Sequence, residues 1–363
     1  MESGKRSRSS CSSTSEARSH STYNQDAGHF EWQEGQMIND RYKVKGLLGD
    51  GTFGRVLEVE DQDGSFKALK VIRAVKRYVE AAKIEVEILH RINRADPTHQ
   101  SNIVQLYEDF PLGGNYCLVF EKLGRSLFDI IKLNEYKGFR MWQVQEIAEQ
   151  LFKAIDFMHT LGLTHTDLKP ENILLVNDEL RFDEEKKINL PVDCTIRVID
   201  FGGATFREDH HSVIINTRQY RAPEVILELG WDTMSDLWSL GCILVELYTG
   251  ELLFPTHKNF EHLAMLEKVL GHMPAWMGKR CSYSYKKYFD RDYFLNYPER
   301  ADHETRRNVR HLLCLEELIP SKYREFRHLI YDLLEFNPNR RLRAKDALRH
   351  RFFDADYRPK RSE

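Results

Sequence analysis

Apolar residues alternate with charged or polar ones from residue 42 onward, in the stretch YKVKGLLGDGTFGRVLEVEDQDGSFKALKVI. This period of two is typical of strands with one buried face, and the glycine-rich turns and DQDG between the apolar runs indicate antiparallel hairpins. Over 77–92 the apolar spacing changes to three and four residues, which predicts a helix, and strand-like residues return at 103–110 and 116–123. We therefore expect a small antiparallel sheet with one main helix.

The pattern becomes mainly helical beyond about residue 125. The stretch MWQVQEIAEQLFKAIDFMHTLG has the spacing of a long amphipathic helix that ends at Gly162. LWSLGCILVELY is an apolar run of about a dozen residues that contains Glu246, which predicts a buried helix rather than a membrane span of ~20 residues. Strands first and helices afterwards predict an α+β fold with a small sheet lobe and a larger, mostly helical lobe.

Residues 1–28 contain many Ser and Arg residues and few that could form a core. Burial in such a segment does not offset the entropy of ordering, so we predict a disordered tail. The folded domain is then expected over 29–363, with the small lobe at about 29–122 and the large lobe at about 123–355.

Composition excludes several classes of protein. The formal net charge is -3 in a chain with 30% charged residues, so no global field directs it to nucleic acid or a membrane. Its six cysteines lie far apart without a C-x-x-C pair, which argues against a disulfide framework and a zinc site and favours a reducing compartment. We expect no direct nucleic-acid partner and no membrane partner.

GDGTFGRV places Gly49, Gly51 and Gly54 in a G-x-G-x-x-G-x-V pattern between two strand patterns. Glycines allow the backbone to approach phosphate oxygens and to donate N–H groups to them. A dinucleotide-binding turn shares the three glycines but requires a helix at the third, whereas RVLEVE has the pattern of a strand. The sequence favours a hairpin that covers phosphates, with an ordinary tight hairpin as the alternative.

Lys70 stands at the end of an apolar strand, in KALK. A carboxylate on the following helix could hold its ammonium group against the α and β phosphates of a nucleotide. Glu85 has a suitable helical position, but Glu80 and Glu87 compete with it. Spacing does not decide among the three, and a solvated edge lysine is the alternative.

HTDLKPEN supplies three groups in a loop that contains Pro170. Asp167 is suited to accept a proton from a substrate hydroxyl, Lys169 to meet a transferred phosphoryl group, and Asn172 to bind a metal ion. Further on, VIDFGGA ends a strand at Asp200, whose carboxylate could hold Mg²⁺ between the β and γ phosphates. An acidic residue before Gly is otherwise a common turn.

These motifs occur in the order GDGTFGRV, KALK, HTDLKPEN, DFG, APE and DLWSLG, and in that order they resemble the eukaryotic protein kinases over about 42–353. The stretch EHLAMLEKVLG at 261–271 is similar to the EHLAMMER signature of the LAMMER, or CDC-like, kinases, and departs from it at Leu266 and Lys268. RYVEAAKIE, TRQYRAPEVIL and an insertion at about 177–195 also resemble that family. Because the insertion alternates charged and apolar residues around Pro191, we expect it to form a hairpin.

The resemblance implies a bilobal protein-kinase fold that binds ATP and Mg²⁺ between its lobes. The implied catalytic residues are Lys70 with Glu85 as its partner, Asp167, Lys169, Asn172, Asp200 and Thr217, of which Asn172 and Asp200 are the metal ligands. The implied nucleotide-binding residues are Leu48, Gly49, Asp50, Gly51, Phe53, Gly54, Val56, Ala68, Lys70, Phe120, Glu121, Leu123, Leu174 and Ile199. Asp129 and Glu171 are candidate partners of substrate arginines, and solvated carboxylates are the alternative.

The function implied is transfer of the γ-phosphoryl group of ATP to Ser and Thr of Ser/Arg-rich proteins such as splicing factors, with tyrosine self-phosphorylation and a role in pre-mRNA splicing. We expect a monomeric catalytic domain in the nucleus, with the cytoplasm as a second location. KRSRSSCSSTSEARS in the tail resembles such a substrate and GKRSR a nuclear address, while an inert linker is the alternative. A catalytically silent nucleotide-binding scaffold and a kinase with another site preference are the alternative functions.

Thr166 stands where most kinases have an arginine that pairs with a phosphate on the activation loop. A threonine cannot form that ion pair, so we hypothesise that packing and neutral hydrogen bonds hold the loop and that activity does not require its phosphorylation. The resemblance also implies that Asp236 accepts hydrogen bonds from the backbone near His165. It further implies a buried pair between Glu224 and Arg341.

Overall fold

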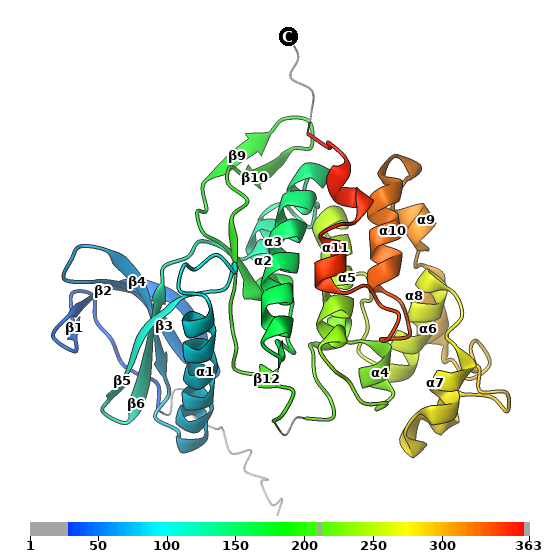
Figure 1. The fold of residues 1–363 in the computed structure, drawn as a ribbon, viewed down its shortest axis with the longest axis horizontal. Coiled ribbons are helices and arrows are strands. Elements are labelled where there is room, and N and C mark those ends of the chain that lie inside the picture. The colour runs from blue at the N-terminus through cyan, green and yellow to red at the C-terminus, as the bar shows by residue number, and fades with distance from the viewer. Residues whose placement is uncertain (1–27, 210–211, 359–363) are drawn as a thin grey trace, which may run out of the picture.

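The structure is a computed structural model that describes residues 28–209 and 212–358. The predicted tail at 1–28 lies outside the described residues except for Gly28, whose carbonyl accepts a hydrogen bond of 2.8 Å from the Ala74 N–H. The chain forms a small lobe built on a sheet and a larger helical lobe beside it (Figure 1). This arrangement is the α+β fold with two unequal lobes that the pattern of apolar residues predicts.

The small lobe is a six-stranded antiparallel sheet in the order β1-β2-β3-β4-β6-β5. Its strands are β1 (Met37–Ile38), β2 (Tyr42–Gly51), β3 (Gly54–Glu60), β4 (Phe66–Ile72), β5 (Leu106–Leu112) and β6 (Asn115–Glu121). Alternation along the strands gives two apolar faces. Leu57, Leu69 and Val119 on one face form a separate small core, while Ile72 and Leu118 on the other belong to the core that includes α1 and the large lobe.

Helix α1 (Lys76–Ala95) packs against β4, β5 and β6 and is the one main helix expected in this lobe. The large lobe contains α2 (Leu127–Leu133), α3 (Met141–Thr160), α4 (Pro223–Ile226), α5 (Met234–Thr249), α6 (Asn259–Leu270), α7 (Ala275–Arg280), α8 (His303–Arg310), α9 (Leu315–Leu318), α10 (Arg324–Leu333) and α11 (Ala344–Ala347). Helix α3 ends two residues before the expected Gly162, which lies beyond it at a φ of 73°.

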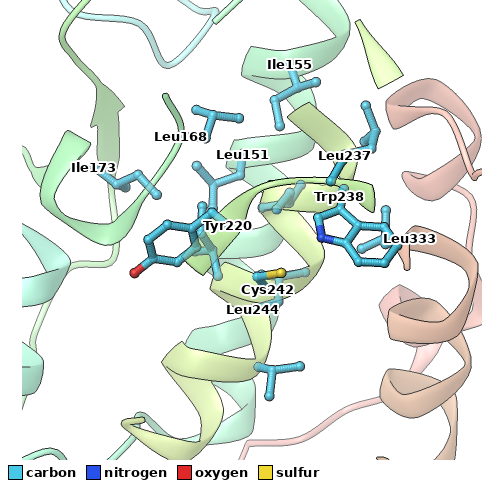
Figure 2. Close-up of a cluster of buried hydrophobic side chains, with 14 of the residues drawn as sticks. Leu151, Ile155, Leu168, Ile173, Tyr220, Leu237, Trp238, Cys242, Leu244 and Leu333 are labelled. Carbon is cyan, nitrogen blue, oxygen red and sulfur yellow. The ribbon is translucent and has the colours of Figure 1, made fainter. Parts of the chain in front are cut away.

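The centre of the large lobe is the contact between α3 and α5 (Figures 1 and 2). Helix α5 is buried along nearly all of its length, as its apolar run predicts. No helix among the described residues is both long enough and apolar enough to cross a membrane. Figure 2 shows Leu168 among these buried side chains. Its two neighbours, Asp167 and Lys169, instead contact each other through their side chains.

Short antiparallel ladders position the loops of the large lobe. They pair β7 (Leu163–Thr164) with β12 (Thr205–Phe206), β8 (Ile173–Leu175) with β11 (Ile196–Val198), and β9 (Leu180–Asp183) with β10 (Ile188–Pro191). The first two ladders place the loops at 165–172 and 199–204 side by side. The third is a hairpin within the insertion at about 177–195, anchored by Arg140, which donates to both carboxylate oxygens of Asp183 at 2.9 and 2.6 Å.

The stretch that resembles the EHLAMMER signature forms α6 and ends at Gly271, whose φ is 93°. Most of its apolar residues are buried in the large lobe, including Leu266, which departs from the signature, while Phe260 and Leu270 are half-buried. Glu261 accepts hydrogen bonds from the Thr256 hydroxyl at 2.9 Å and from the Asn308 amide at 3.1 Å. The helix therefore acts in packing and in connecting neighbouring segments.

Candidate active site

A cleft of about 1260 Å³ lies between the two lobes. It is lined by every residue predicted to contact a nucleotide, namely Leu48, Gly49, Asp50, Gly51, Phe53, Gly54, Val56, Ala68, Lys70, Phe120, Glu121, Leu123, Leu174 and Ile199. The glycine-rich hairpin is formed by β2 and β3, with Gly51 opposite Gly54. A Cβ atom at Gly54 would lie 2.2 Å from the Val71 carbonyl oxygen, so only glycine fits there.

Lys70 pairs with Glu85 across the back of the cleft. Its Nζ donates to both Glu85 carboxylate oxygens at 2.9 Å. Burial lowers the pKa of Lys70. The carboxylates of Glu85 and Asp200 raise this pKa by more than burial lowers it, so the pKa lies above its ordinary value. Of the competing carboxylates, Glu80 lies 3.8 Å from Lys76 on the exposed side of α1, and Glu87 is exposed. The pair therefore fixes a positive charge inside the cleft.

The apolar walls of the cleft lie next to the segment that joins the lobes. Val56, Ala68, Leu174 and Ile199 contribute side chains from both lobes, and their arrangement suits a flat base. The Glu121 N–H already donates to the Gln105 carbonyl at 3.2 Å, so that group is not available to a ligand. Residues that the sequence reasoning did not identify also line the cleft, including Thr52, Leu89, Val104, Phe128 and Phe201.

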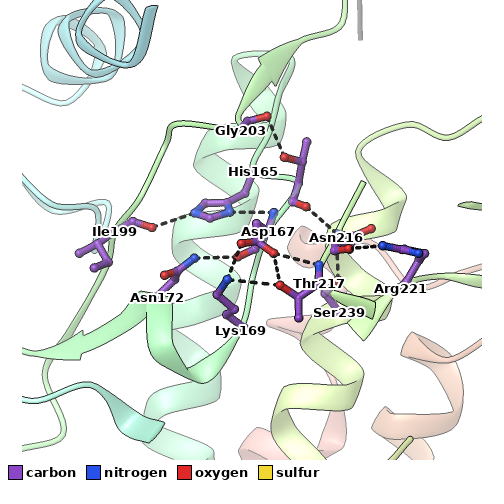
Figure 3. A network of polar contacts seen from close by, with 11 residues as sticks. His165, Asp167, Lys169, Asn172, Ile199, Gly203, Asn216, Thr217, Arg221 and Ser239 are labelled. Carbon is purple, nitrogen blue, oxygen red and sulfur yellow. Dashed lines mark hydrogen bonds and ion pairs between the residues drawn. The ribbon is translucent and has the colours of Figure 1, made fainter. Parts of the chain in front are cut away.

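Asp167, Lys169 and Thr217 form a compact polar group in the loops at 165–172 and 215–221 (Figure 3). Asp167 Oδ1 accepts hydrogen bonds from the Thr217 N–H at 2.9 Å and from its hydroxyl at 2.7 Å. Lys169 Nζ donates to Asp167 Oδ2 at 2.6 Å and to Thr217 Oγ1 at 3.2 Å. Both carboxylate oxygens are therefore fixed by donors from two segments.

These donors decide the charge of Asp167. Burial raises the pKa of this carboxyl group, while the hydrogen bonds and charge of Lys169 and the hydrogen bonds of Thr217 lower it more, so the net pKa lies below its ordinary value. Asp167 is accordingly a carboxylate at neutral pH. It can orient a hydroxyl group that approaches it and accept a proton as that hydroxyl becomes more acidic during reaction.

The backbone of this loop is held by Asp236 on α5, a fully buried residue. Its carboxylate accepts hydrogen bonds from the His165 N–H at 2.9 Å and from the Thr166 N–H at 3.1 Å, which confirms the expected contact with the loop. His159 Nε2 lies 3.1 Å from the same carboxylate, a partner that the sequence reasoning missed. Asp236 thus holds the backbone of the loop although it does not itself line the cleft.

Asn172 and Asp200 are the two residues predicted to bind a metal ion, and both line the cleft. The Asn172 amide nitrogen donates to the Asp167 carbonyl at 2.9 Å, which orients its amide oxygen away from that carbonyl. Asp200 is exposed and has a φ of 66°, which is unusual for a residue with a Cβ atom. Among the described residues no group of three or more His, Cys, Asp or Glu side chains could hold a metal ion. One carboxylate and one amide oxygen fit a hard cation that takes its other ligands from phosphates and water.

Thr166 forms neutral hydrogen bonds with the segment that follows Asp200, the kind of contact that was expected to hold this segment. Its hydroxyl donates to the Gly203 carbonyl at 2.7 Å. Its own carbonyl accepts hydrogen bonds from the Asn216 N–H at 2.9 Å and from the Asn216 amide at 3.0 Å. Thr166 therefore contacts both ends of the segment that runs from Gly203 to Asn216 through neutral hydrogen bonds. Figure 3 shows where Gly203 and Asn216 lie beside this loop.

The two candidate substrate-binding carboxylates differ in what they do in the fold. Asp129 forms a capping box with Ser126 at the start of α2, so this contact accounts for its residue type. Glu171 is exposed at the mouth of the cleft. Burial, together with the nearby charge of Glu171, raises the pKa of Glu246 to about 7, although the hydrogen bond from Tyr220 lowers it. Glu246 is buried and does not line the cleft, so Glu171 is the carboxylate of this pair that a ligand in the cleft could meet.

Glu224 and Arg341 form a buried ion pair within the large lobe. The two guanidinium NH groups donate to the two Glu224 carboxylate oxygens at 2.7 and 2.9 Å. Arg341 also donates to the Met234 carbonyl at 2.8 Å, at the start of α5. This confirms the expected pair, whose role is to connect the segment at 222–227 with the C-terminal helices.

Comparison with known proteins gives concordant results. The protein kinase domain family matches residues 42–353. The chain is 44% identical to the dual specificity protein kinase CLK2 of Homo sapiens over 90% of this chain and 66% of that protein. It is 43% identical to the serine/threonine-protein kinase AFC3 of Arabidopsis thaliana over 90% of this chain and 85% of that protein. It is 42% identical to the dual specificity protein kinase lkh1 of Schizosaccharomyces pombe over 92% of this chain and 50% of that protein.

This chain therefore spans about half the length of lkh1 and about two thirds of CLK2. Among solved structures, the crystal structure of another kinase domain superposes with a TM-score of 0.82 at 40% identity, over 90% of this chain and 99% of that one. The expected bilobal fold is thus confirmed by a solved structure as well as by the arrangement of elements seen here.

Proposed function

The chain belongs to the protein kinase family and, within it, to the LAMMER or CDC-like kinases, and on this basis we propose that it transfers the γ-phosphoryl group of ATP to Ser and Thr residues and, in self-modification, to Tyr. Its family membership implies ATP and a divalent metal as ligands. The observation that supports activity best is the Asp167, Lys169 and Thr217 group, which adjoins a cleft that contains Lys70 and Glu85.

The residues divide the work of phosphoryl transfer. Lys70, held by Glu85, meets the phosphates at the back of the cleft, and the glycine-rich hairpin covers them with backbone N–H groups. Asp167 orients the substrate hydroxyl and receives its proton, while Lys169 offers positive charge to the transferred group. Phosphoryl transfer depends mainly on such positioning and charge stabilisation, so the fixed geometry of these side chains is the main catalytic contribution.

We propose Mg²⁺ as the metal, held by Asn172 and Asp200. Mg²⁺ prefers oxygen ligands and is commonly bound by one or two protein groups together with phosphates and water, which is the donor set available here. When bound, it neutralises charge on the β and γ phosphates. The contribution of the chain is to fix the Asn172 side chain through its bond to the Asp167 carbonyl.

We propose Ser/Arg-rich proteins, including splicing factors, as substrates, and hence a role in pre-mRNA splicing and a nuclear location. The exposed Glu171 carboxylate, which lines the cleft, supports a preference for arginine, since guanidinium groups pair with carboxylates in two-point contacts. Asp129 also lines the cleft, so it is a second candidate even though it caps α2.

A peptide array tests this proposal. Peptides that place serine among arginines, among acidic residues or before proline would be offered with labelled ATP and Mg²⁺, with the Asp167→Asn variant as the control. We expect the arginine set to accept most phosphate and the variant to accept almost none. Phosphate in the acidic or proline set instead would show a kinase of another preference, and nucleotide binding without transfer to any set would show a silent scaffold.

A further inference from the structure

The tip of the glycine-rich hairpin lies against the first turn of α1. The Phe53 side chain, which is 60% exposed, contributes its ring to an edge-to-face contact with Tyr78, with ring centroids 5.2 Å apart and planes at 82°. Offset or perpendicular contacts of this kind stabilise aromatic pairs beyond the area that they bury. The contact therefore links the hairpin tip to α1 through side chains.

The main chain of the tip is attached to the same region. The Arg73 N–H donates to the Phe53 carbonyl at 2.9 Å, and its guanidinium Nη1 donates to the Thr52 carbonyl at 3.1 Å. Arg73 lies in the short connection between β4 and α1. The hairpin tip is thus attached to the entrance of α1 by two backbone acceptors and one ring.

Tyr78 is itself held in place on α1. Its ring is partly buried against the main core. Arg77 Nη2 donates to its hydroxyl at 3.1 Å, and the Arg77 guanidinium lies 4.8 Å from the ring centroid. Tyr78 is seven residues before Glu85, and two helical turns bring residues at that spacing to the same face. The helix position that brings Glu85 to Lys70 therefore also brings Tyr78 to Phe53.

We propose that Phe53 and Tyr78 form a latch that holds the glycine-rich hairpin closed over the nucleotide phosphates whenever α1 is in the position that pairs Glu85 with Lys70. Tyr78 is then a positioning residue that acts on the nucleotide through Phe53. This inference rests on the proposed function of the cleft as an ATP site. It adds a second link between α1 and the nucleotide, separate from the ion pair.

The test compares Tyr78→Ala with Tyr78→Phe in the full chain. Two quantities are measured: the dissociation constant of ATP with Mg²⁺, and the rate of amide hydrogen exchange at residues 49–54. For Tyr78→Ala we expect affinity to fall by about two- to tenfold, the range that one aromatic pair supplies, and exchange at the hairpin to become faster. Tyr78→Phe keeps the ring and should remain within about twofold of the unmodified chain.

Two further variants make the result specific. Phe53→Ala removes the other half of the latch from an exposed position, and combining it with Tyr78→Ala should add little to either change, because both remove the same contact. Tyr283→Ala replaces a tyrosine that is 91% exposed in the large lobe and should change neither quantity.

Unchanged affinity and exchange in Tyr78→Ala would overturn the latch, as would effects of the two alanine substitutions that simply add. Loss of affinity in Tyr78→Phe equal to that in Tyr78→Ala would also exclude it, since the ring is retained. The exchange measurement needs no phosphoryl transfer, so it judges the latch even if the array experiment shows that the chain transfers no phosphate.

Discussion

The two walls of the cleft are held in different ways. In the loop beside the large-lobe wall, both oxygens of Asp167 are fixed by donors from two segments, and the loop backbone is held by Asp236, which is fully buried. On the small-lobe wall, Lys70 forms hydrogen bonds with one carboxylate, that of Glu85, its side chain is 24% exposed, and the glycine-rich hairpin above it is open to solvent. The Asp167 group is therefore positioned by the core, whereas the small-lobe wall depends on a few contacts.

The largest expected effect comes from the large-lobe wall. Asp167→Asn should lower the rate of phosphoryl transfer by about 10³-fold, within the range of 10²- to 10⁴-fold for loss of a general base, because an amide cannot accept the proton. ATP affinity should stay within about twofold, because Asp167 does not line the cleft. Transfer of labelled phosphate and calorimetric titration with ATP would measure the two. A loss of affinity as large as the loss of rate would show that the walls do not act separately.

The next effect concerns the support of that wall. Arg341→Met leaves the Glu224 carboxylate buried without its partner, which should lower the free energy of unfolding by about 3–5 kcal/mol. Arg343→Met is the matched control, because Arg343 forms an exposed pair with Asp346 at 2.8 Å and such pairs contribute about 0–1 kcal/mol. Urea unfolding followed by fluorescence would compare the two variants. Equal losses would mean that burial of the pair has no special role.

The parts of this site that could be predicted from the sequence are those whose function requires a particular type of residue. Proton acceptance, phosphate contact and metal binding each require particular residue types, so Asp167, Lys169 and Asn172 stand out in HTDLKPEN. Spacing alone did not select Glu85 over Glu80 and Glu87, because all three lie on one helix and only the packing of α1 on the sheet decides which one meets Lys70. Family resemblance supplied what spacing could not.

Contacts to main-chain carbonyls were not predictable. The Thr166 hydroxyl donates to the Gly203 carbonyl, and the Ser239 hydroxyl donates to the Tyr220 carbonyl at 2.8 Å, between segments that only the complete fold brings together. Any residue offers a carbonyl, so such partners leave no pattern in the sequence. Asp129 shows the converse: its residue type suggested a substrate contact, and the structure shows that it also caps a helix.

On the small-lobe wall, a smaller change should have a measurable effect. Glu85→Gln keeps the size of the side chain and replaces a charged hydrogen-bond acceptor of Lys70 with a neutral one, a difference of about 1–1.5 kcal/mol, or about tenfold in kcat/KM for ATP. Glu87→Gln, on the exposed side of the same helix, should change nothing. Steady-state kinetics with varied ATP would check both. An equal loss in both variants would indicate a general effect on α1 rather than on the ion pair.

The smallest effects concern Thr166, which contacts the segment from Gly203 to Asn216. Thr166→Val keeps the branched shape at a φ of 70° but removes the hydrogen bond of 2.7 Å to Gly203. One neutral hydrogen bond contributes about 0.5–1.5 kcal/mol, and the Asp236 and Asn216 bonds to the Thr166 backbone remain, so activity should fall by less than about tenfold. Thr249→Val, which removes a similar hydroxyl contact at the end of α5, should have no effect.

Treatment of the unmodified chain with phosphatase sharpens the same point. If neutral contacts hold the segment from Gly203 to Asn216, removal of any phosphate should leave activity within about twofold, since no charged hydrogen bond is lost. A hundredfold loss would mean that a phosphate, not Thr166, orders the segment. In that case Thr166→Val should have little further effect on the treated enzyme. The activities of the unmodified chain and of Thr166→Val, each measured before and after phosphatase treatment, distinguish the two explanations. One assigns the ordering of the segment to Thr166 and the other assigns it to a phosphate.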